Sequence, residues 1–240
     1  AVEEELEHAE ALKASAHTVA APEKKYGFLA VCAGEGLATV FKDLGADEVV
    51  SGGQTMNPST EAILREVNHT PSEIVFVLPN NKNIVMAAQQ CVGLTEKQVI
   101  VVPTHSIPQG ISAMMSVDTA EEDPQAILAA MTEAAAAVTT AQITYAARNS
   151  DFDGFEIHEG DYLALKEGKL FGTDSQLDAL LEKLAEEGKN ASFIALYYGE
   201  DVSEADAQAA GAKFQAICPD AEISVLSGGQ PVYYYIISFE

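Results

Sequence analysis

Short apolar runs alternate with helical patterns over residues 26–120, and this alternation restricts the possible folds more than any other feature. The run 28–32 has the length of a strand and precedes residues with helical spacing, namely Leu37, Val40, Phe41 and Leu44. Similar runs, each followed by a loop and a helical pattern, occupy 48–51, 74–78 and 99–102. Because the runs are apolar on both faces, they predict a parallel sheet covered by helices on both sides.

The pattern changes near residue 139. Residues 139–147 and 153–171 show the alternation and glycine turns typical of antiparallel strands. The remaining elements expected are helices over 119–138, 174–187 and 203–216, with strands over 192–198, 222–226 and 232–239. We therefore predict an α/β protein in three parts: a linker or helix over 1–25, a parallel α/β lobe over 26–138, and a mixed α/β lobe over 139–240.

A faint internal repeat supports two related lobes. The segment FLAVCAGE at 28–35 resembles FIALYYGE at 193–200. In both halves a helical pattern and a short strand follow, and each ends in Ser-Gly-Gly-Gln, at 51–54 and 227–230. Any two strand–helix–strand units share part of this pattern, but the common tetrapeptide favours a true repeat. A two-lobed protein commonly binds its ligand between the lobes.

The charge balance excludes several classes of partner. The chain has 13 Lys+Arg and 37 Asp+Glu, so its net charge is 13 − 37 = −24. Such a polyanion repels phosphate backbones and anionic lipids, which argues against nucleic-acid and membrane-surface binding and favours a basic protein partner. No apolar run is long enough to predict an integral membrane segment. The three widely spaced cysteines fit reduced thiols in the cytoplasm. The chain starts at Ala1 and not at Met, so we expect a fragment of a longer protein.

Neutral polar residues follow the strands of the first lobe, at the loops where parallel sheets bind ligands. The candidates for binding a partner or ligand are Gln54, Thr55, Asn57, Ser59, Asn80, Asn81 and Asn83, with His105, Gln109 and Gln230 as further candidates. These loops could receive a carboxylate, a phosphate or a protein loop. The plainer interpretation is that they make helix caps and turns. On that interpretation, Pro58 lies in a first helical turn that Asn57 caps.

Catalytic groups are scarce in the sequence. Cys32 ends a predicted strand but has no base beside it, which favours a buried structural thiol. Among the histidines, His105 is the best candidate for a catalytic base, yet the sequence shows no residue that would act together with it. No zinc-type Cys/His spacing, phosphate-binding loop or nucleophile elbow occurs. We predict no catalytic residue, no metal ligand and no cofactor site in this chain.

Several motifs resemble those in the carboxy-terminal region of the bacterial fatty acid kinase A protein. Its family is also described as dihydroxyacetone-kinase-like or DAK-phosphatase-like. The motifs are GEGL at 34–37, GGQTMNPST at 52–60, LPNNKNI at 78–84, VPT at 102–104, IPQG at 107–110 and SGGQPV at 227–232. The resemblance runs from about residue 20 to 240. It implies a two-lobed fold similar to DegV-type proteins, in agreement with the repeat. His105 departs from the residue that the family favours in its loop.

The resemblance also implies a function in lipid metabolism. In that family an amino-terminal domain binds ATP and Mg²⁺, and the carboxy-terminal domain docks a DegV-type protein that holds the fatty acid for acyl-phosphate formation. The chain is then an inactive docking part of an ATP-dependent fatty acid kinase. Two alternatives stand beside it: a module that binds a fatty acid or small anion between its lobes, and a hydrolase or phosphatase using Cys32 or His105. A homodimer is a further arrangement compatible with the sequence.

Overall fold

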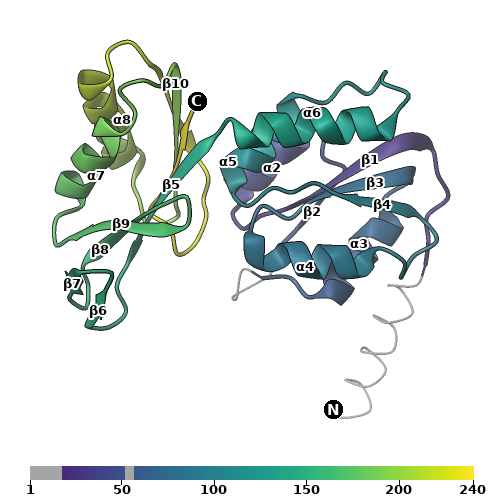
Figure 1. Ribbon diagram of the computed structural model, residues 1–240, viewed down its shortest axis with the longest axis horizontal. Helices are drawn as coiled ribbons and strands as arrows, with labels where there is room; N and C mark the ends of the chain where they lie inside the picture. The colour runs from purple at the N-terminus through teal and green to yellow at the C-terminus, as the bar shows by residue number, and fades with distance from the viewer. Residues whose placement is uncertain (1–17, 52–56) are drawn as a thin grey trace. The chain divides into compact units, whose positions relative to one another are not determined.

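The computed structural model describes residues 18–51 and 57–240, which fold into two compact units (Figure 1). The first unit contains the described residues up to Ala33 together with Thr39–Ala135, and the second contains Gly34–Ala38 and Ala136–Glu240. Most of the predicted linker or helix over 1–25 lies outside the described residues.

The first unit is built on a four-stranded parallel sheet. Its strands are β1 (Lys24–Val31), β2 (Glu48–Val50), β3 (Ser72–Leu78) and β4 (Gln98–Val101), in the order β2-β1-β3-β4. The register pairs Val31 with Val50 between β1 and β2, and Phe28 with Phe76 between β1 and β3. The predicted parallel sheet is thereby confirmed.

Helices cover both faces of this sheet, as the apolar strands require. The helices are α2 (Glu35–Asp43), α3 (Thr60–His69), α4 (Lys82–Cys91), α5 (Ile107–Met115) and α6 (Pro124–Ala136). Figure 1 shows α3 and α4 on one face and the other three on the opposite face. On the α3/α4 face, Val75 and Val77 are fully buried against Ile63 and Ala88. On the other face the rings of Phe28 and Phe76 stack at 5.2 Å.

Two predicted helix starts in this unit were wrong by a few residues. α3 begins at Thr60 and is capped by Ser59, whose side chain accepts a hydrogen bond from the N–H of Ala62, so Asn57 is not the cap and Pro58 precedes the helix. α6 begins at Pro124 and not at 119. The reason is local: the carboxylates of Asp118 and Glu121 each accept a hydrogen bond from the N–H two residues further on, which favours turns over helix, and Asp123 then caps α6 by accepting from the N–H of Gln125.

The second unit carries a six-stranded mixed sheet in the order β11-β10-β12-β5-β8-β9. Its elements are β5 (Thr139–Tyr145), β8 (Tyr162–Lys166), β9 (Lys169–Asp174), α7 (Leu177–Glu186), β10 (Phe193–Tyr198), α8 (Glu204–Ile217), β11 (Glu222–Ser227) and β12 (Tyr235–Phe239). Only the β10–β11 pair is parallel. A separate hairpin pairs β6 (Ser150–Phe152) with β7 (Phe155–Ile157). The predicted mixed α/β architecture is confirmed.

The two copies of the internal repeat fold into the same kind of unit. In the first, β1 is followed by α2 and by the parallel neighbour β2. In the second, β10 is followed by α8 and by the parallel neighbour β11. Leu29 and Ile194, which the repeat aligns, are both buried in their cores. The shared pattern therefore corresponds to a shared β-α-β step.

The last strand is shorter than the sequence predicted. β12 starts at Tyr235, and residues 232–234 are not part of it. Val232 has a φ of 69°, a left-handed conformation that interrupts an extended strand and that β-branched residues rarely adopt. The side chain of Gln230 stabilises this loop by donating to the carbonyls of Tyr197 and Tyr233.

Candidate functional site

The loops that follow the parallel strands of the first unit meet at one edge of its sheet, which the strand order now places. β1 lies between β2 and β3, so the chain leaves β1 toward one side and later returns to its other side. In an open α/β sheet, this reversal is the point where ligands are usually bound. The loop after β3 begins at Pro79, beside the end of β1 at Val31, and it carries Asn80.

Asn80, which follows β3, forms hydrogen bonds with the end of β1 and with the loop after β4. Its Nδ2 donates to the carbonyl of Val31 at 3.0 Å, and its backbone N–H donates to Oγ1 of Thr104 at 3.1 Å. The residue is 6% exposed and has a φ of 57°, which asparagine tolerates better than most residues. Asn80 therefore fills the space between β1, β3 and the loop after β4 and lies beneath the surface of this edge.

Gly110, near the start of α5, packs directly against the amide of Asn80. A Cβ at Gly110 would lie 2.0 Å from Oδ1 and 2.6 Å from Cγ of Asn80. The same Oδ1 is buried without a hydrogen-bond partner. Only a residue without a side chain leaves room for the amide at this distance. Sequence reasoning named Asn80 but missed Gly110 and Thr104 as its partners, because their positions depend on which strands are neighbours.

Two other predicted residues cap helices at this edge. Ser59 caps α3, and Asn81 caps α4 by accepting a hydrogen bond from the N–H of Asn83 at 2.9 Å. The side chain of Ser59 is exposed and that of Asn81 is partly exposed. Both residues therefore cap helices, as the plainer interpretation of the sequence holds. Capping still leaves the outer surface of each residue available to a partner.

Beside Ser59 and Lys82, the exposed residues at this edge include Asn57, Asn83 and His105. His105 lies in the loop after β4, where its N–H donates to Oε1 of Gln109 at 2.7 Å. Ser106 caps α5 next to it. These three exposed side chains present neutral amides and an imidazole, and they contribute nothing to the buried core.

The remaining predicted residues lie elsewhere or cannot be placed. Gln54 and Thr55 lie outside the described residues. Gln230 is 1% exposed in the second unit, where its amide stabilises the loop before β12. Gln230 therefore belongs to a different unit from the residues that follow the strands of the first sheet. We call that edge of the first sheet, with Asn57, Ser59, Asn81, Asn83 and His105, the polar edge.

Electrostatically, the polar edge differs from the rest of the chain. Residues 79–90 and 102–117, which hold the loops after β3 and β4 together with most of α4 and all of α5, contain Lys82 and no acid. Their formal net charge is +1, against −24 for the whole chain. These residues present no carboxylate to a partner, whereas Glu61 lies in the first turn of the neighbouring α3.

The cysteines are poorly suited to nucleophilic catalysis. All three are buried and none forms a disulfide. Burial raises the pKa of Cys32 to about 12 and that of Cys91 to about 11, and it also raises the pKa of Cys218. Since the thiolate is the reactive form, a hydrolase based on Cys32 would begin from an almost fully protonated thiol.

We expect the three thiols to resist modification in the native chain. At pH 8, a pKa of about 12 leaves roughly one Cys32 in 10⁴ as thiolate. Ellman's reagent should therefore release less than one equivalent over the time in which it releases three from the chain unfolded in guanidinium. Rapid release of a full equivalent from the native chain would contradict the burial of these side chains.

Among residues 18–51 and 57–240, no group of three or more His, Cys, Asp or Glu side chains is placed to hold a metal ion. In the same ranges, no helix combines the length and apolar character needed to cross a bilayer.

Known proteins resemble this chain over most of its length. The sequence pattern of the fatty acid kinase A-like family, C-terminal region, matches residues 27–240. Protein YloV of Bacillus subtilis is 38% identical over 217 residues, which cover 90% of this chain and 39% of YloV. The chain therefore spans about two fifths of the length of that relative.

Solved structures with little sequence identity share the fold. A DegV family protein from Thermus thermophilus, described by its fatty acid binding, has a TM-score of 0.61 at 14% identity, over 90% of this chain and 99% of that protein. The fatty acid kinase B3 protein of Streptococcus pneumoniae, loaded with linoleic acid, has a TM-score of 0.50 at 12% identity, over 76% of each chain. The predicted DegV-like fold is confirmed.

Proposed function

This chain belongs to the C-terminal family of fatty acid kinase A-like proteins, and we propose that it is the non-catalytic module on which a fatty-acid-binding, DegV-type partner docks. The proposed docking surface is the polar edge of the first unit, centred on Asn83 and His105. In this role the module positions the carboxylate of the bound fatty acid for acyl-phosphate formation. Positioning of this kind is a main contribution of proteins to phosphoryl transfer.

One observation carries the proposal: the loops after β3 and β4 and the helices that follow them contain no acid, in a chain of net charge −24. Core packing does not require Asn83 or His105, since both are exposed. Hydrogen-bonding groups in these loops suit a protein partner, because amides and imidazoles can pair with backbone and side-chain groups alike. In the same loops the buried Asn80 donates to Val31 and packs against Gly110.

The chemistry itself would come from outside this chain. ATP and Mg²⁺ would bind to another part of the longer protein, and the fatty acid would arrive in the DegV-type partner. The described residues are consistent with that division, because the buried Cys32 is held as a thiol. This chain would contribute affinity and orientation.

The double variant Asn83→Ala/His105→Ala tests the proposal. Each substitution removes an exposed hydrogen-bonding group without touching a cap or the core. At about 1 kcal/mol for each lost hydrogen bond, the fatty-acid-loaded partner should bind the double variant at least tenfold more weakly, by roughly a factor of five for each residue. Calorimetric titration of the loaded partner into each chain measures this difference.

The matched control is Gln89→Ala. Gln89 is also exposed and also lies on α4, but it is six residues beyond Asn83, about 9 Å along the helix axis. Its loss should leave the affinity unchanged. Equal affinities for wild type and the double variant would remove the polar edge from the interface.

A further inference from the structure

Three tyrosines form a cluster on the second unit, far along the sequence from the polar edge. Tyr145 ends β5, Tyr162 begins β8, and Tyr234 lies just before β12. The ring of Tyr234 meets both others edge-on, with centroids 6.2 Å from Tyr145 and 5.4 Å from Tyr162. Tyr145 and Tyr162 are direct partners in the β5–β8 pairing. Tyr145 is 48% exposed, so solvent reaches this tyrosine cluster.

The backbone holds the cluster in place. The N–H of Tyr234 donates to the carbonyl of Ile143 at 2.8 Å, and Oγ1 of Thr144 donates to the carbonyl of Val232 at 2.9 Å. Both bonds join the loop before β12 to β5. Val232 keeps its left-handed conformation between them, and such strain persists only where the surroundings impose it. The rings are therefore ordered before any ligand arrives, which lowers the entropic cost of binding.

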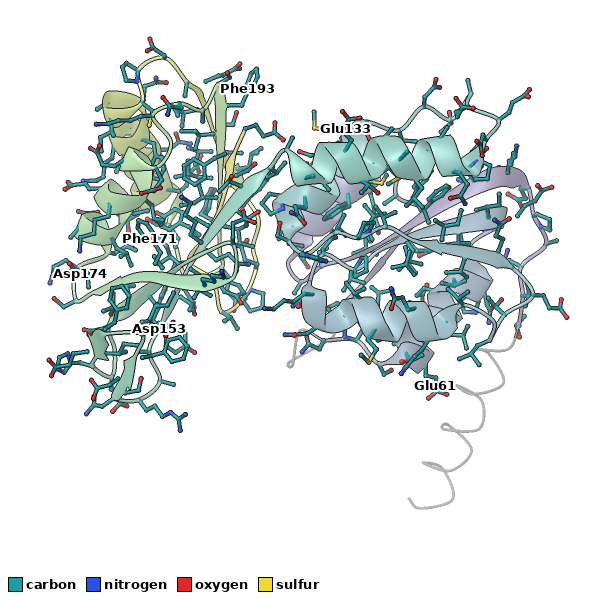
Figure 2. The ribbon with its side chains drawn as sticks, in the orientation of Figure 1. Glu61, Glu133, Asp153, Phe171, Asp174 and Phe193 are labelled. Atoms are coloured by element: carbon teal, nitrogen blue, oxygen red, sulfur yellow. The ribbon has the colours of Figure 1, made fainter. Side chains whose placement is uncertain are left out.

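One acidic residue lies beside the tyrosine cluster, and a second acts on it electrostatically. Burial raises the pKa of Tyr234, and the neighbouring Tyr162 and the carboxylate of Asp201 add to the rise. Asp174 is the direct partner of Tyr162 across β8 and β9, and Figure 2 labels it on β9. The ammonium of Lys183 lies 3.8 Å from Asp174 and offsets part of its charge.

The adjoining hairpin adds to this negative charge. Residues 149–165 contain five acids and neither Lys nor Arg. Figure 2 labels one of them, Asp153, at the turn of the β6–β7 hairpin, and β7 packs against β9. His158 lies between two of the others, 3.2 Å from Glu156 and 3.4 Å from Asp161. Arg148 and Lys166 border this segment, so the formal net charge of residues 148–166 is 2 − 5 = −3.

We propose that the tyrosine cluster binds a lysine or arginine side chain from an exposed basic segment of a protein partner. A guanidinium or ammonium group over a tyrosine ring is attracted by the ring quadrupole, and the nearby carboxylates supply the opposite charge. A purely apolar segment would bury those carboxylates without partners, and a phosphate backbone would be repelled. This surface goes beyond the proposed function, since it belongs to the second unit and recognises a basic side chain.

An acetylated and amidated tetra-arginine peptide is the probe. It is titrated into the chain at about 150 mM salt, where long-range attraction is largely screened. Calorimetry gives the affinity, and NMR of ¹³C-labelled tyrosine rings gives the location. We expect Tyr145→Phe to bind within twofold of wild type and Tyr145→Leu to bind about fivefold more weakly, since only the latter loses the ring. Both variants have the same net charge as wild type. The general attraction of an acidic chain for arginine is therefore the same in all three and does not contribute to the difference in affinity.

The control is Phe152→Leu, which removes an aromatic ring that is 57% exposed on β6 without altering the tyrosine cluster. It should bind the peptide as wild type does. Equal binding by Tyr145→Leu and wild type would overturn the proposal. The wild-type spectrum is an independent test that needs no variant: ring signals of Tyr145 and Tyr234 that stay unmoved at saturation would overturn it as well.

Discussion

Replacing Asn80 with aspartate should lower the free energy of unfolding by about 3 kcal/mol or more at neutral pH, although the two side chains have nearly the same shape. The reason is the contact with Val31, where Nδ2 donates to the carbonyl oxygen at 3.0 Å. Aspartate would place a second acceptor there, and it would leave a charge unpaired in a position that is 6% exposed. Urea denaturation followed by circular dichroism measures the loss.

The loss in free energy of unfolding caused by Asn80→Asp should become smaller as the pH falls. Burial without a partner raises the pKa of a carboxyl group, so the folded variant would bind a proton more tightly than the unfolded chain does. The protonated carboxyl could again donate to Val31. The difference in unfolding free energy between wild type and variant is therefore largest above the pKa that the new carboxyl group has in the folded state. It decreases as the pH falls through that pKa.

Asn81→Asp is the matched control for this prediction. Asn81 caps α4, where its side chain only accepts a hydrogen bond. Aspartate is an equally good cap, and the helix dipole favours its charge. The control should stay within about 0.5 kcal/mol of wild type. Similar losses at both positions, or a deficit at position 80 that does not change with pH, would contradict the assigned hydrogen bond.

Gly110→Ala should destabilise the chain by about 2 kcal/mol, even though alanine is the better helix former by up to ~1 kcal/mol. The new Cβ would lie 2.0 Å from Oδ1 and 2.8 Å from Nδ2 of Asn80. The amide would have to move, and its hydrogen bond to Val31 would be lost. Chemical denaturation of the variant gives the magnitude.

A double-mutant cycle separates this contact from a general effect on α5. In an Asn80→Gly background the amide is absent, and glycine accepts the φ of 57° at that position. Gly110→Ala should then be nearly neutral or stabilising. The coupling energy between the two positions should be about 2 kcal/mol. Additive effects would mean that the close approach of Gly110 to Asn80 does not determine the stability of this edge.

The sequence predicted strand and helix types well because those signals are local. Apolar runs of strand length and apolar residues at helical spacing depend only on near neighbours along the chain. The same reasoning failed where several local signals compete. Asn57 and Ser59 are both good caps, and the cap of α3 is Ser59, whose side chain accepts a hydrogen bond from the N–H of Ala62. At residues 232–234 the alternation favoured a strand, but contacts with Gln230 decided the backbone conformation.

Sequence reasoning named residues of the candidate site but did not distinguish their structural roles. Asn80 and Asn81 are adjacent residues of the same type in one loop, and the sequence treats them alike. In the structure Asn80 is buried between strand ends, and Asn81 lies at the surface as a cap. Their roles differ because Val31 and Thr104, the hydrogen-bond partners of Asn80, are 49 and 24 residues away in sequence.

The sequence by itself determined the α/β class, the change of architecture near residue 139, and a family resemblance that the comparison confirmed. Each of these follows from residue type and spacing along the chain. Only the tertiary structure decided the strand order β2-β1-β3-β4, the burial of Asn80 beneath the polar edge, and the meeting of Tyr145, Tyr162 and Tyr234. The physical reason is that hydrogen bonds and ring contacts join residues far apart in sequence, and no local pattern records which of them become neighbours.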